Sequence, residues 1–151
     1  MDDTFIIELQ SLLNKYNKRL DWDDYFMSLC LLISNRSSCK RLNVGCILVN
    51  DRRVISSGYN GHLPGLPHDS IVIDNHEQCT IHAEQNAIAD ASKRGVSLNG
   101  CSAYITHYPC LICTKLLIAS GIKEIKYLND YKNDRLCHTF LEHSKINIYK
   151  L

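Results

Sequence analysis

The feature that most constrains this chain is a set of three metal-ligand side chains in two short motifs. His82-Ala83-Glu84 supplies a histidine, and Pro109-Cys110-Leu111-Ile112-Cys113 supplies two cysteines three residues apart. Imidazole nitrogen and thiolate sulfur are ligands of Zn²⁺, and three protein ligands leave the fourth tetrahedral position open to water, as in catalytic zinc sites. The chain must therefore fold so that His82, Cys110 and Cys113 meet at one point.

Glu84 follows His82 by two residues and has a separate predicted role. At that spacing its carboxylate would lie beside the water on the metal, where it can take and return a proton without being a ligand. The pattern H-x-E followed by P-C-x-x-C is typical of zinc-dependent nucleobase deaminases. Outside such a site, an acid in the first turn of a helix is explained by the helix dipole alone.

Length and composition favour one globular domain. The chain has 151 residues, of which 45% are apolar, enough to bury a core. Its net charge of +1 gives no reason to expect nucleic acid or a polybasic membrane anchor. It lacks both an apolar run of about 20 residues and a basic signal-peptide region at Met1-Asp2-Asp3. We expect a cytoplasmic protein with no membrane or nucleic-acid partner.

The eight cysteines do not suggest a disulfide framework. Cys30, Cys46 and Cys101 fall in apolar runs, where a free thiol behaves as a small buried hydrophobe. Cys110 and Cys113 have metal-ligand spacing, and in a reducing compartment that spacing indicates a metal or redox site before a disulfide. No thioredoxin-like surroundings support the redox interpretation.

Hydrophobic periodicity predicts the elements of the first half. Residues 4–20 form an amphipathic helix, which we expect to pack on the domain or on another subunit. Asp23 or Asp24 caps a second, largely buried helix. Residues 44–49 and 54–59 form a β-hairpin. A long irregular segment follows, and a loop of about twenty residues within a domain suggests function.

The second half alternates helices and strands. Thr80 is the candidate N-cap of a helix through Ala91, which places His82 and Glu84 in its first turn. Pro109 suits the first position of the next helix, so that Cys110 and Cys113 point the same way. The remaining elements are predicted to be strands at 102–107, 123–128 and 145–149 and a helix at 134–143. The order indicates a layered α/β domain, a mixed sheet with helices on both faces.

From Asp21 to the end, the chain resembles the deoxycytidylate (dCMP) deaminases of the cytidine deaminase-like superfamily, in particular their bacterial late-competence and viral type. The resemblance rests on short stretches spread along the chain. They are Tyr25-Phe26-Met27, Val44-Gly45-Cys46, Gly58-Tyr59-Asn60-Gly61, Val72-Ile73-Asp74-Asn75-His76, His82-Ala83-Glu84-Gln85-Asn86-Ala87-Ile88, Tyr108-Pro109-Cys110-Leu111-Ile112-Cys113 and Asp130-Tyr131-Lys132-Asn133. It implies a three-layer α/β/α deaminase domain at 21–151, preceded by a helical extension at 1–20.

The resemblance also implies the reaction. His82, Cys110 and Cys113 would hold Zn²⁺, and dCMP would be hydrolysed to dUMP and ammonia, supplying thymidylate synthesis. Glu84 would pass a proton from water to N3 of cytosine and a second proton to the departing ammonia. A deaminase of dCTP, or of both dCMP and dCTP, is the alternative within the family.

Further residues are candidates for substrate contacts. Asn60 would bind the sugar and base, although an asparagine between glycine-rich turn residues is often only a turn residue. Val44 and Ala83 belong to the matching stretches, and Tyr108 and Tyr131 are candidate walls, or ordinary packing. Three cations between two predicted elements could bind the 5′-phosphate or form a solvated loop. They are Arg36, Lys40 and Arg41.

Regulation rests on the resemblance alone. It implies a homohexamer activated by dCTP with Mg²⁺ and inhibited by dTTP, with the effector near Tyr59, Asn60 and Gly61. The loop that follows, 62–69, is shorter than in many relatives. A second zinc is one interpretation of the histidines there, although their spacing matches no defined site. Its ligands would be His62, His68, His76 and Cys79.

An alternative of a different class is a closed structural zinc site in a binding module without catalysis. Cys79, three residues before His82, or His107, three before Cys110, would then supply the fourth ligand. A closed site gives Glu84 no role at its spacing, which favours the enzyme.

Overall fold

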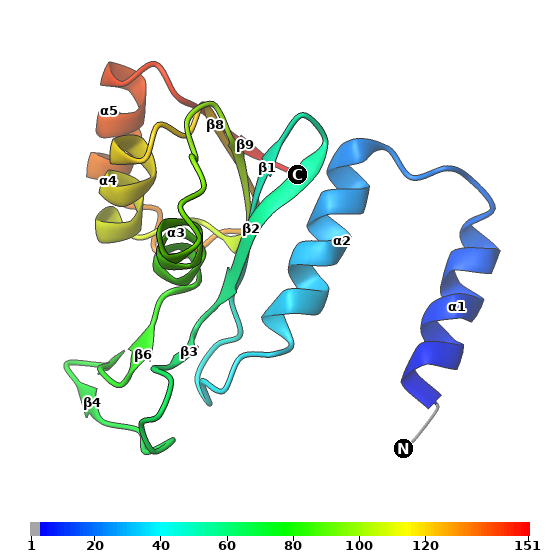
Figure 1. Cartoon of the computed structure of the whole chain (residues 1–151), viewed down its shortest axis with the longest axis horizontal. Helices are drawn as coiled ribbons and strands as arrows, with labels where there is room; N and C mark the ends of the chain where they lie inside the picture. Colours follow the sequence, from blue (N-terminus) through cyan, green and yellow to red (C-terminus); the bar gives the residue numbers. More distant parts are fainter. Residues whose placement is uncertain (1–3) are drawn as a thin grey trace.

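The computed structural model describes residues 4–151 and contains a five-stranded mixed sheet in the order β2-β1-β7-β8-β9 (Figure 1). Strand β1 (Gly45–Asn50) pairs antiparallel with both β2 (Arg53–Tyr59) and β7 (Ser102–His107). Strands β8 (Glu124–Asn129) and β9 (Asn147–Lys150) then continue the sheet parallel to β7. Mixed pairing of this kind was predicted from the order of the elements and is confirmed.

Helices cover both faces of the sheet. Helix α2 (Trp22–Ser34) lies on one face, and α3 (Ala83–Lys93), α4 (Leu111–Ala119) and α5 (Arg135–His143) lie on the other (Figure 1). The two faces follow the alternation of side chains along a strand. In β1, Ile47 packs in the cluster with α2, whereas Leu48 packs in the cluster with the other three helices. The predicted three-layer α/β/α fold is therefore confirmed.

Helix α2 begins earlier than the capping prediction. Its N-cap is Asp21, whose carboxylate accepts a hydrogen bond from the backbone N–H of Asp24 at 2.8 Å, so the assignment to Asp23 or Asp24 was wrong. Asp23 instead accepts hydrogen bonds from the Tyr104 hydroxyl and from Lys126 Nζ, both at 2.6 Å. This carboxylate joins the helix to the sheet rather than capping it.

The segment between β2 and α3 contains two small antiparallel strand pairs, of which the inner one is a hairpin. Strand β3 (Gly61–His62) pairs with β6 (Thr80–Ile81), and β4 (Val72–Ile73) pairs with β5 (His76–Glu77). The turn between β4 and β5 has Asp74 and Asn75 at positive φ, as tight hairpin turns require. The sequence predicted an irregular loop here because strands of two residues have no detectable periodicity.

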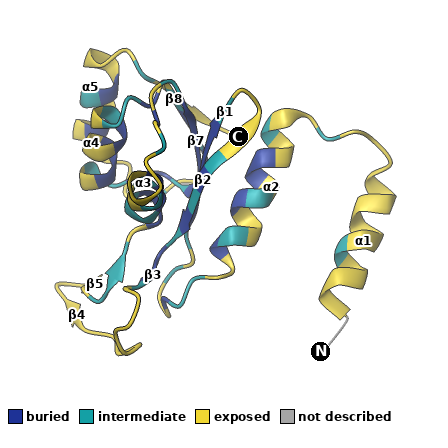
Figure 2. Ribbon diagram, in the orientation of Figure 1, coloured by how far each residue is buried: buried dark blue, intermediate teal, exposed yellow. Residues whose placement is uncertain are grey.

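Helix α1 (Thr4–Tyr16) stands at the side of the domain, beyond α2 (Figures 1 and 2). It forms where an amphipathic helix was predicted, but none of its residues, all of which the structure describes, is buried. Packing on the domain is therefore not seen. The first three residues of the predicted extension lie outside the described residues. None of the helices between residues 4 and 151 has the length and apolar character that crossing a membrane would require.

Candidate active site

The metal-ligand motifs lie at the N-termini of α3 and α4. His82 and Cys110 are the N-caps of these helices, both with extended backbone (φ −71° for each). Both predicted helix starts were two residues too early, because Thr80 is still paired with His62 between β3 and β6 and the first residue of α4 is Leu111 and not Pro109. Both ligand motifs nevertheless meet the ends of helices whose free N–H groups favour negative charge.

The three donor atoms already have the spacing of a zinc site. His82 Nδ1 lies 3.5 Å from Cys110 Sγ and 3.4 Å from Cys113 Sγ. Tetrahedral Zn²⁺ at ordinary bond lengths would hold nitrogen and sulfur about 3.6 Å apart. The His82, Cys110 and Cys113 donors all lie within 4.8 Å of one another. The donor set therefore fits zinc without rearrangement.

The two thiols differ in protonation before metal binds. Hydrogen bonds from Cys113 and His82, against the cost of burial, lower the pKa of Cys110 to about 4. The contact with Cys110 and burial raise the pKa of Cys113. Zinc takes both cysteines as thiolates, so metal binding would release protons from this pair.

Glu84 is buried beside the ligands. It is 4% exposed, in the first turn of α3, and burial raises the pKa of its carboxyl group. A carboxylate with a raised pKa is a stronger base than one in water, and a general base works best with a pKa near the working pH. Glu84 therefore has the placement and the basicity of a proton carrier.

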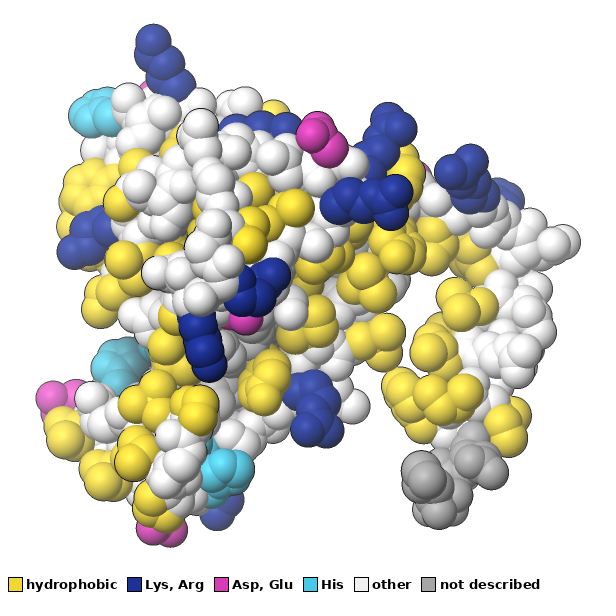
Figure 3. All heavy atoms as spheres, in the orientation of Figure 1, with side chains coloured by type: hydrophobic (Ala, Val, Ile, Leu, Met, Phe, Trp, Pro, Cys, Tyr) yellow, Lys and Arg dark blue, Asp and Glu magenta, His cyan; other side chains and the backbone are white. Residues whose placement is uncertain are grey.

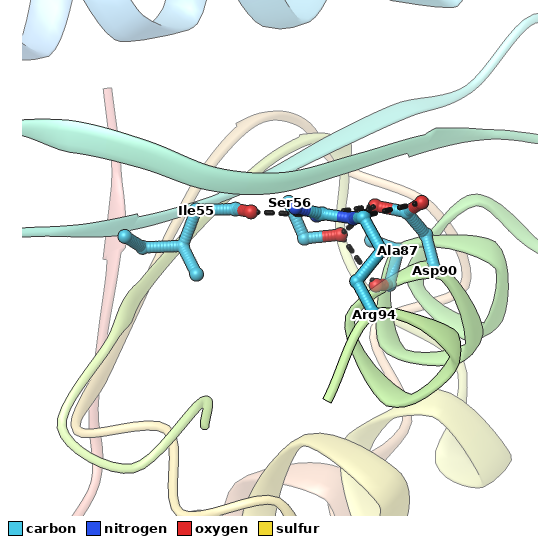
Figure 4. A network of polar contacts seen from close by, with 5 residues as sticks. All are labelled: Ile55, Ser56, Ala87, Asp90 and Arg94. Carbon is cyan, nitrogen blue, oxygen red and sulfur yellow. Dashed lines mark hydrogen bonds and ion pairs between the residues drawn. The ribbon is translucent and has the colours of Figure 1, made fainter. Parts of the chain in front are cut away.

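A network between β2 and α3 holds this helix in place (Figure 4). Ser56 Oγ lies 2.6 Å from the Ala87 carbonyl oxygen and 2.8 Å from Asp90 Oδ2. Arg94 pairs with Asp90 at 2.6 Å and donates to the Ile55 carbonyl oxygen at 2.7 Å. Because His82 and Glu84 are at the start of α3, these contacts help to fix the position of the centre.

His82, Cys110 and Glu84 line a cavity of about 510 Å³, within the range of small-molecule sites, and Cys113 is buried behind them. Six of the predicted contact residues also line it. They are Val44, Asn60, Ala83, Tyr108, Tyr131 and Arg41. Arg36, Lys40, Tyr59 and Gly61 do not belong to its lining. Arg36 lies in the turn that ends α2, where its backbone N–H bonds to Ile33.

Asn60 supports the cavity wall through its own side chain. Its Oδ1 accepts from the Val44 N–H and its Nδ2 donates to the Leu42 carbonyl oxygen, both at 2.7 Å. The side chain is buried, at 8% exposure. Asn60 therefore fixes the backbone of residues 42–44, a role that the sequence did not predict alongside its expected substrate contact.

Arg41 and Tyr131 join two distant segments at the cavity. Arg41 Nη1 donates to the Tyr131 hydroxyl at 2.9 Å, and the guanidinium lies 5.9 Å from the centre of the ring. Arg41 is exposed and Tyr131 half-buried. The pair places a cation where it can meet an anionic group that enters the cavity.

Several lining residues were missed by sequence reasoning. The hairpin of β4 and β5 contributes His76 and Glu77, and the segment before β1 contributes Cys39 and Leu42. His107 also lines the cavity; its Nδ1 lies 3.0 Å from Thr106 Oγ1, and burial lowers its pKa. Cys39, Leu42 and Glu77 have no characteristic spacing, so no sequence signal marked them, and the sequence suggested His76 and His107 as metal ligands only.

The predicted alternative metal sites are not assembled. Within residues 4–151, His82, Cys110 and Cys113 are the one group of three or more potential ligands that gathers closely enough to hold an ion. Neither Cys79 nor His107 joins this group as a fourth ligand. The rings of His62 and His68 stack with centroids 4.7 Å apart, but His76 and Cys79 do not complete a second site with them.

Comparisons with known proteins agree with this geometry. Residues 20–129 match the family model described as cytidine and deoxycytidylate deaminase zinc-binding region. The chain is 42% identical over 135 residues to ComE operon protein 2 of Bacillus subtilis (strain 168), covering 87% of this chain and 71% of that protein. It is 35% identical over 124 residues to the deoxycytidylate deaminase of Mycobacterium phage D29, covering 72% of this chain and 95% of the phage protein.

Longer and solved relatives give the same result. The chain is 35% identical over 140 residues to the deoxycytidylate deaminase of Saccharomyces cerevisiae but spans only 45% of that protein. The dCMP deaminase of cyanophage S-TIM5, solved in complex with dCMP and dUMP, superimposes with a TM-score of 0.79 at 29% identity, covering 89% of this chain and all of that one. The resemblance seen in the sequence is confirmed, and the chain belongs to the zinc-dependent cytidine and deoxycytidylate deaminase family.

Proposed function

We propose that this chain catalyses the zinc-dependent hydrolytic deamination of dCMP to dUMP and ammonia. The observation that carries the proposal is the convergence of His82, Cys110 and Cys113 at zinc spacing, beside a cavity that the buried carboxyl group of Glu84 also lines. Zinc bound there would make the attacking water more acidic and stabilise negative charge as it forms on the oxygen.

Glu84 moves the protons in this reaction. It takes one from water and delivers it to N3 of the cytosine ring, which makes C4 more electrophilic. The water oxygen bonds to C4, and Glu84 carries its remaining proton to the amino nitrogen, so that the C4–N bond breaks, ammonia leaves and C4 becomes a carbonyl carbon. Burial suits this cycle, because a raised pKa lets one carboxyl group both accept and donate near neutral pH.

The cavity wall orients the nucleotide. We assign the base to the part of the cavity formed by Ala83, Val44 and Tyr108, beside Glu84. Asn60 keeps the Val44 segment in place through its hydrogen bonds and contacts the sugar. The 5′-phosphate is assigned to Arg41, with Tyr131 holding the guanidinium, since Arg36 and Lys40 do not line the cavity. An arginine offers two parallel donors to a phosphate.

Regulation by dCTP with Mg²⁺ and by dTTP, in a homohexamer, stays a prediction within this proposal. An effector near Tyr59 and Gly61 would be outside the cavity lining but adjacent to Asn60. Its effect would reach the substrate through the hydrogen bonds of Asn60 to Leu42 and Val44. Deamination of dCTP itself is the alternative, which a substrate panel separates from activation.

The test uses zinc-loaded protein and Glu84→Gln, with dCMP, dCTP, deoxycytidine and CMP as substrates and chromatography of the products. Glu142→Gln, an exposed glutamate on α5, is the matched control. We expect the wild type and the control to deaminate dCMP and Glu84→Gln to lose about 10²- to 10⁴-fold in turnover while it keeps its zinc. Absence of turnover in the wild type with every substrate would favour the binding module.

A further inference from the structure

Helix α1 exposes an apolar stripe that the rest of the described chain, residues 17–151, leaves uncovered. The stripe consists of Phe5, Leu9, Leu12, Leu13 and Tyr16, which recur at the spacing of one helix face. Phe5 is 51% exposed, Leu12 64% and Leu13 51%. An isolated helix of 13 residues is marginal in water, so its stability must come from packing of this face.

Helix α2 has a second uncovered stripe beside its core-facing side. Trp22, Tyr25 and Leu32, with exposures of 41%, 42% and 40%, lie on one face together with the partly buried Leu29. In Figure 3 the hydrophobic side chains of α1 lie along the edge of the helix that faces the domain, with open space between them and the domain. The α1 stripe therefore borders a space that one more helix could fill.

The uncovered area matches what one partner of a specific complex buries. Side chains of this size at about half exposure each leave on the order of 100 Å² uncovered. Seven of them would offer about 700 Å² per copy, close to the contribution of one partner in a typical interface. The seven are Phe5, Leu12, Leu13, Tyr16, Trp22, Tyr25 and Leu32.

The charged side chains beside the α1 stripe can form ion pairs with the same side chains of a second copy. Glu8 and Lys15 are seven residues apart and therefore occupy the same flank of the stripe, two helical turns from each other. When two copies of α1 pair antiparallel about their midpoint, Glu8 faces Lys15 of the partner subunit, and the same pair repeats on the other side of the two-fold axis. In a parallel pairing the same flank of the two helices would lie on opposite sides of the contact, so Glu8 and Lys15 would not meet.

We propose that α1 is a homotypic assembly helix, which pairs antiparallel with α1 of a second copy and whose stripe, together with that of α2, forms the core of a four-helix interface. The match to the deaminase family begins at residue 20, so α1 lies outside the matched region, and α2 lies at its start. The proposal does not rest on the assigned reaction.

The first experiment compares the mass in solution of the full zinc-loaded chain with that of Leu12→Glu, by sedimentation equilibrium at several concentrations. Asn14→Glu, which places the same charge on the opposite face of α1, is the control. We expect Leu12→Glu to reduce the mass of the assembly by half or more at micromolar protein, and Asn14→Glu to leave it unchanged. Bound zinc, one per chain in all three proteins, reports that the domain is folded. An unchanged mass for Leu12→Glu would overturn the proposal.

The second experiment tests the antiparallel pairing by charge exchange. Glu8→Lys places two cations opposite each other at both ends of the helix pair, so we expect weaker association. The double variant Glu8→Lys/Lys15→Glu restores opposite charges across the axis and should recover the wild-type mass. If the double variant dissociates as readily as the single one, antiparallel pairing of α1 is wrong; if α1 packs on the α2 of its own chain, the mass will not change in any variant.

Discussion

Gly58 on β2 lies directly against the backbone of Ala83, the residue between His82 and Glu84. A Cβ atom at position 58 would lie 2.4 Å from the Ala83 carbonyl oxygen and 2.5 Å from the Ala87 backbone nitrogen. Both atoms belong to the backbone of α3, which cannot move aside as a side chain can. The absence of a side chain at one strand position thus sets how closely the sheet approaches the helix at whose start His82 and Glu84 lie.

Gly58→Ala should therefore damage stability and metal binding together. We expect the free energy of unfolding to fall by about 1 to 3 kcal/mol, as for overpacked sites, and zinc affinity to fall because His82 moves with α3. Urea titration and zinc retained after dialysis measure the two effects. Ser57→Ala, on the same strand, is the control, and equal zinc affinity in both variants would show that α3 can shift without moving His82.

The β2–α3 network predicts a pH-dependent contribution to stability. The Arg94 guanidinium, with help from Ser56, holds the pKa of Asp90 below its ordinary value of 3.8. A carboxyl group with a depressed pKa stabilises the fold above its unfolded pKa, and this contribution disappears as the pH falls through the folded value. Asp90→Asn should thus be less stable than the wild type at pH 7, by a difference that shrinks below about pH 4.

Urea titrations of zinc-free protein at several pH values measure this difference without a contribution from metal loss. Asp69→Asn, an exposed aspartate in the loop after β3, is the control. A difference between Asp90→Asn and the wild type that stays constant down to pH 3 would mean that Asp90 acts through its shape and not its charge.

Removal of zinc should make one cysteine in particular reactive toward alkylation. Cys110 is half-buried and its thiol has a pKa lowered to about 4, whereas Cys113 is buried with a raised pKa. Because the thiolate is the reactive form, we expect brief alkylation at neutral pH to modify Cys110 in chelator-treated protein and to spare it when zinc is bound. Mass spectrometry of peptides identifies the site.

Two internal controls accompany this experiment. Cys79 is half-buried outside the centre and should react equally with and without zinc, whereas Cys46 and Cys101 are fully buried and should not react. Equal labelling of Cys110 in both states would contradict its assignment as a ligand.

The strands of the sheet and the metal centre were predictable because the sequence patterns that indicate them lie within short stretches of the chain. The run of strand-forming residues identified Ser102–His107, which is β7, and the chemical types of the ligand side chains, with their spacing, identified zinc. The caps were not predictable to the residue. Thr80 has the chemistry of an N-cap, but it pairs with His62 across the β3–β6 strand pair, so the helix begins only at Ala83.

The lining of the cavity near Arg41 could not be predicted from local sequence patterns. Arg36, Lys40 and Arg41 are equivalent in sequence terms, but only Arg41 lines the cavity. The difference arises from the path of the backbone after α2, which Asn60 fixes by bonds to Leu42 and Val44. Tertiary hydrogen bonds between segments that are distant in sequence leave no local pattern from which they could be predicted.

Arg41→Ala should selectively weaken the use of phosphorylated substrate. A hydrogen bond to a charged group contributes about 1.5 to 3 kcal/mol, so kcat/KM for dCMP should fall about tenfold or more, mainly through KM. The value of kcat/KM for deoxycytidine, which has no phosphate, should stay near that of the wild type. Steady-state kinetics with both substrates give the comparison.

Tyr131→Phe tests the orientation of the Arg41 guanidinium separately from its charge. It removes the hydroxyl that accepts the hydrogen bond from Arg41 at 2.9 Å but leaves the guanidinium and the ring. We expect a smaller rise in KM for dCMP than Arg41→Ala produces, because the cation is still present but less well placed. Arg36→Ala and Lys40→Ala remove cations outside the cavity lining and should behave as the wild type. A larger rise in KM from either control than from Arg41→Ala would mean that the phosphate binds on the other side of the loop. The base would then need a different position against Glu84.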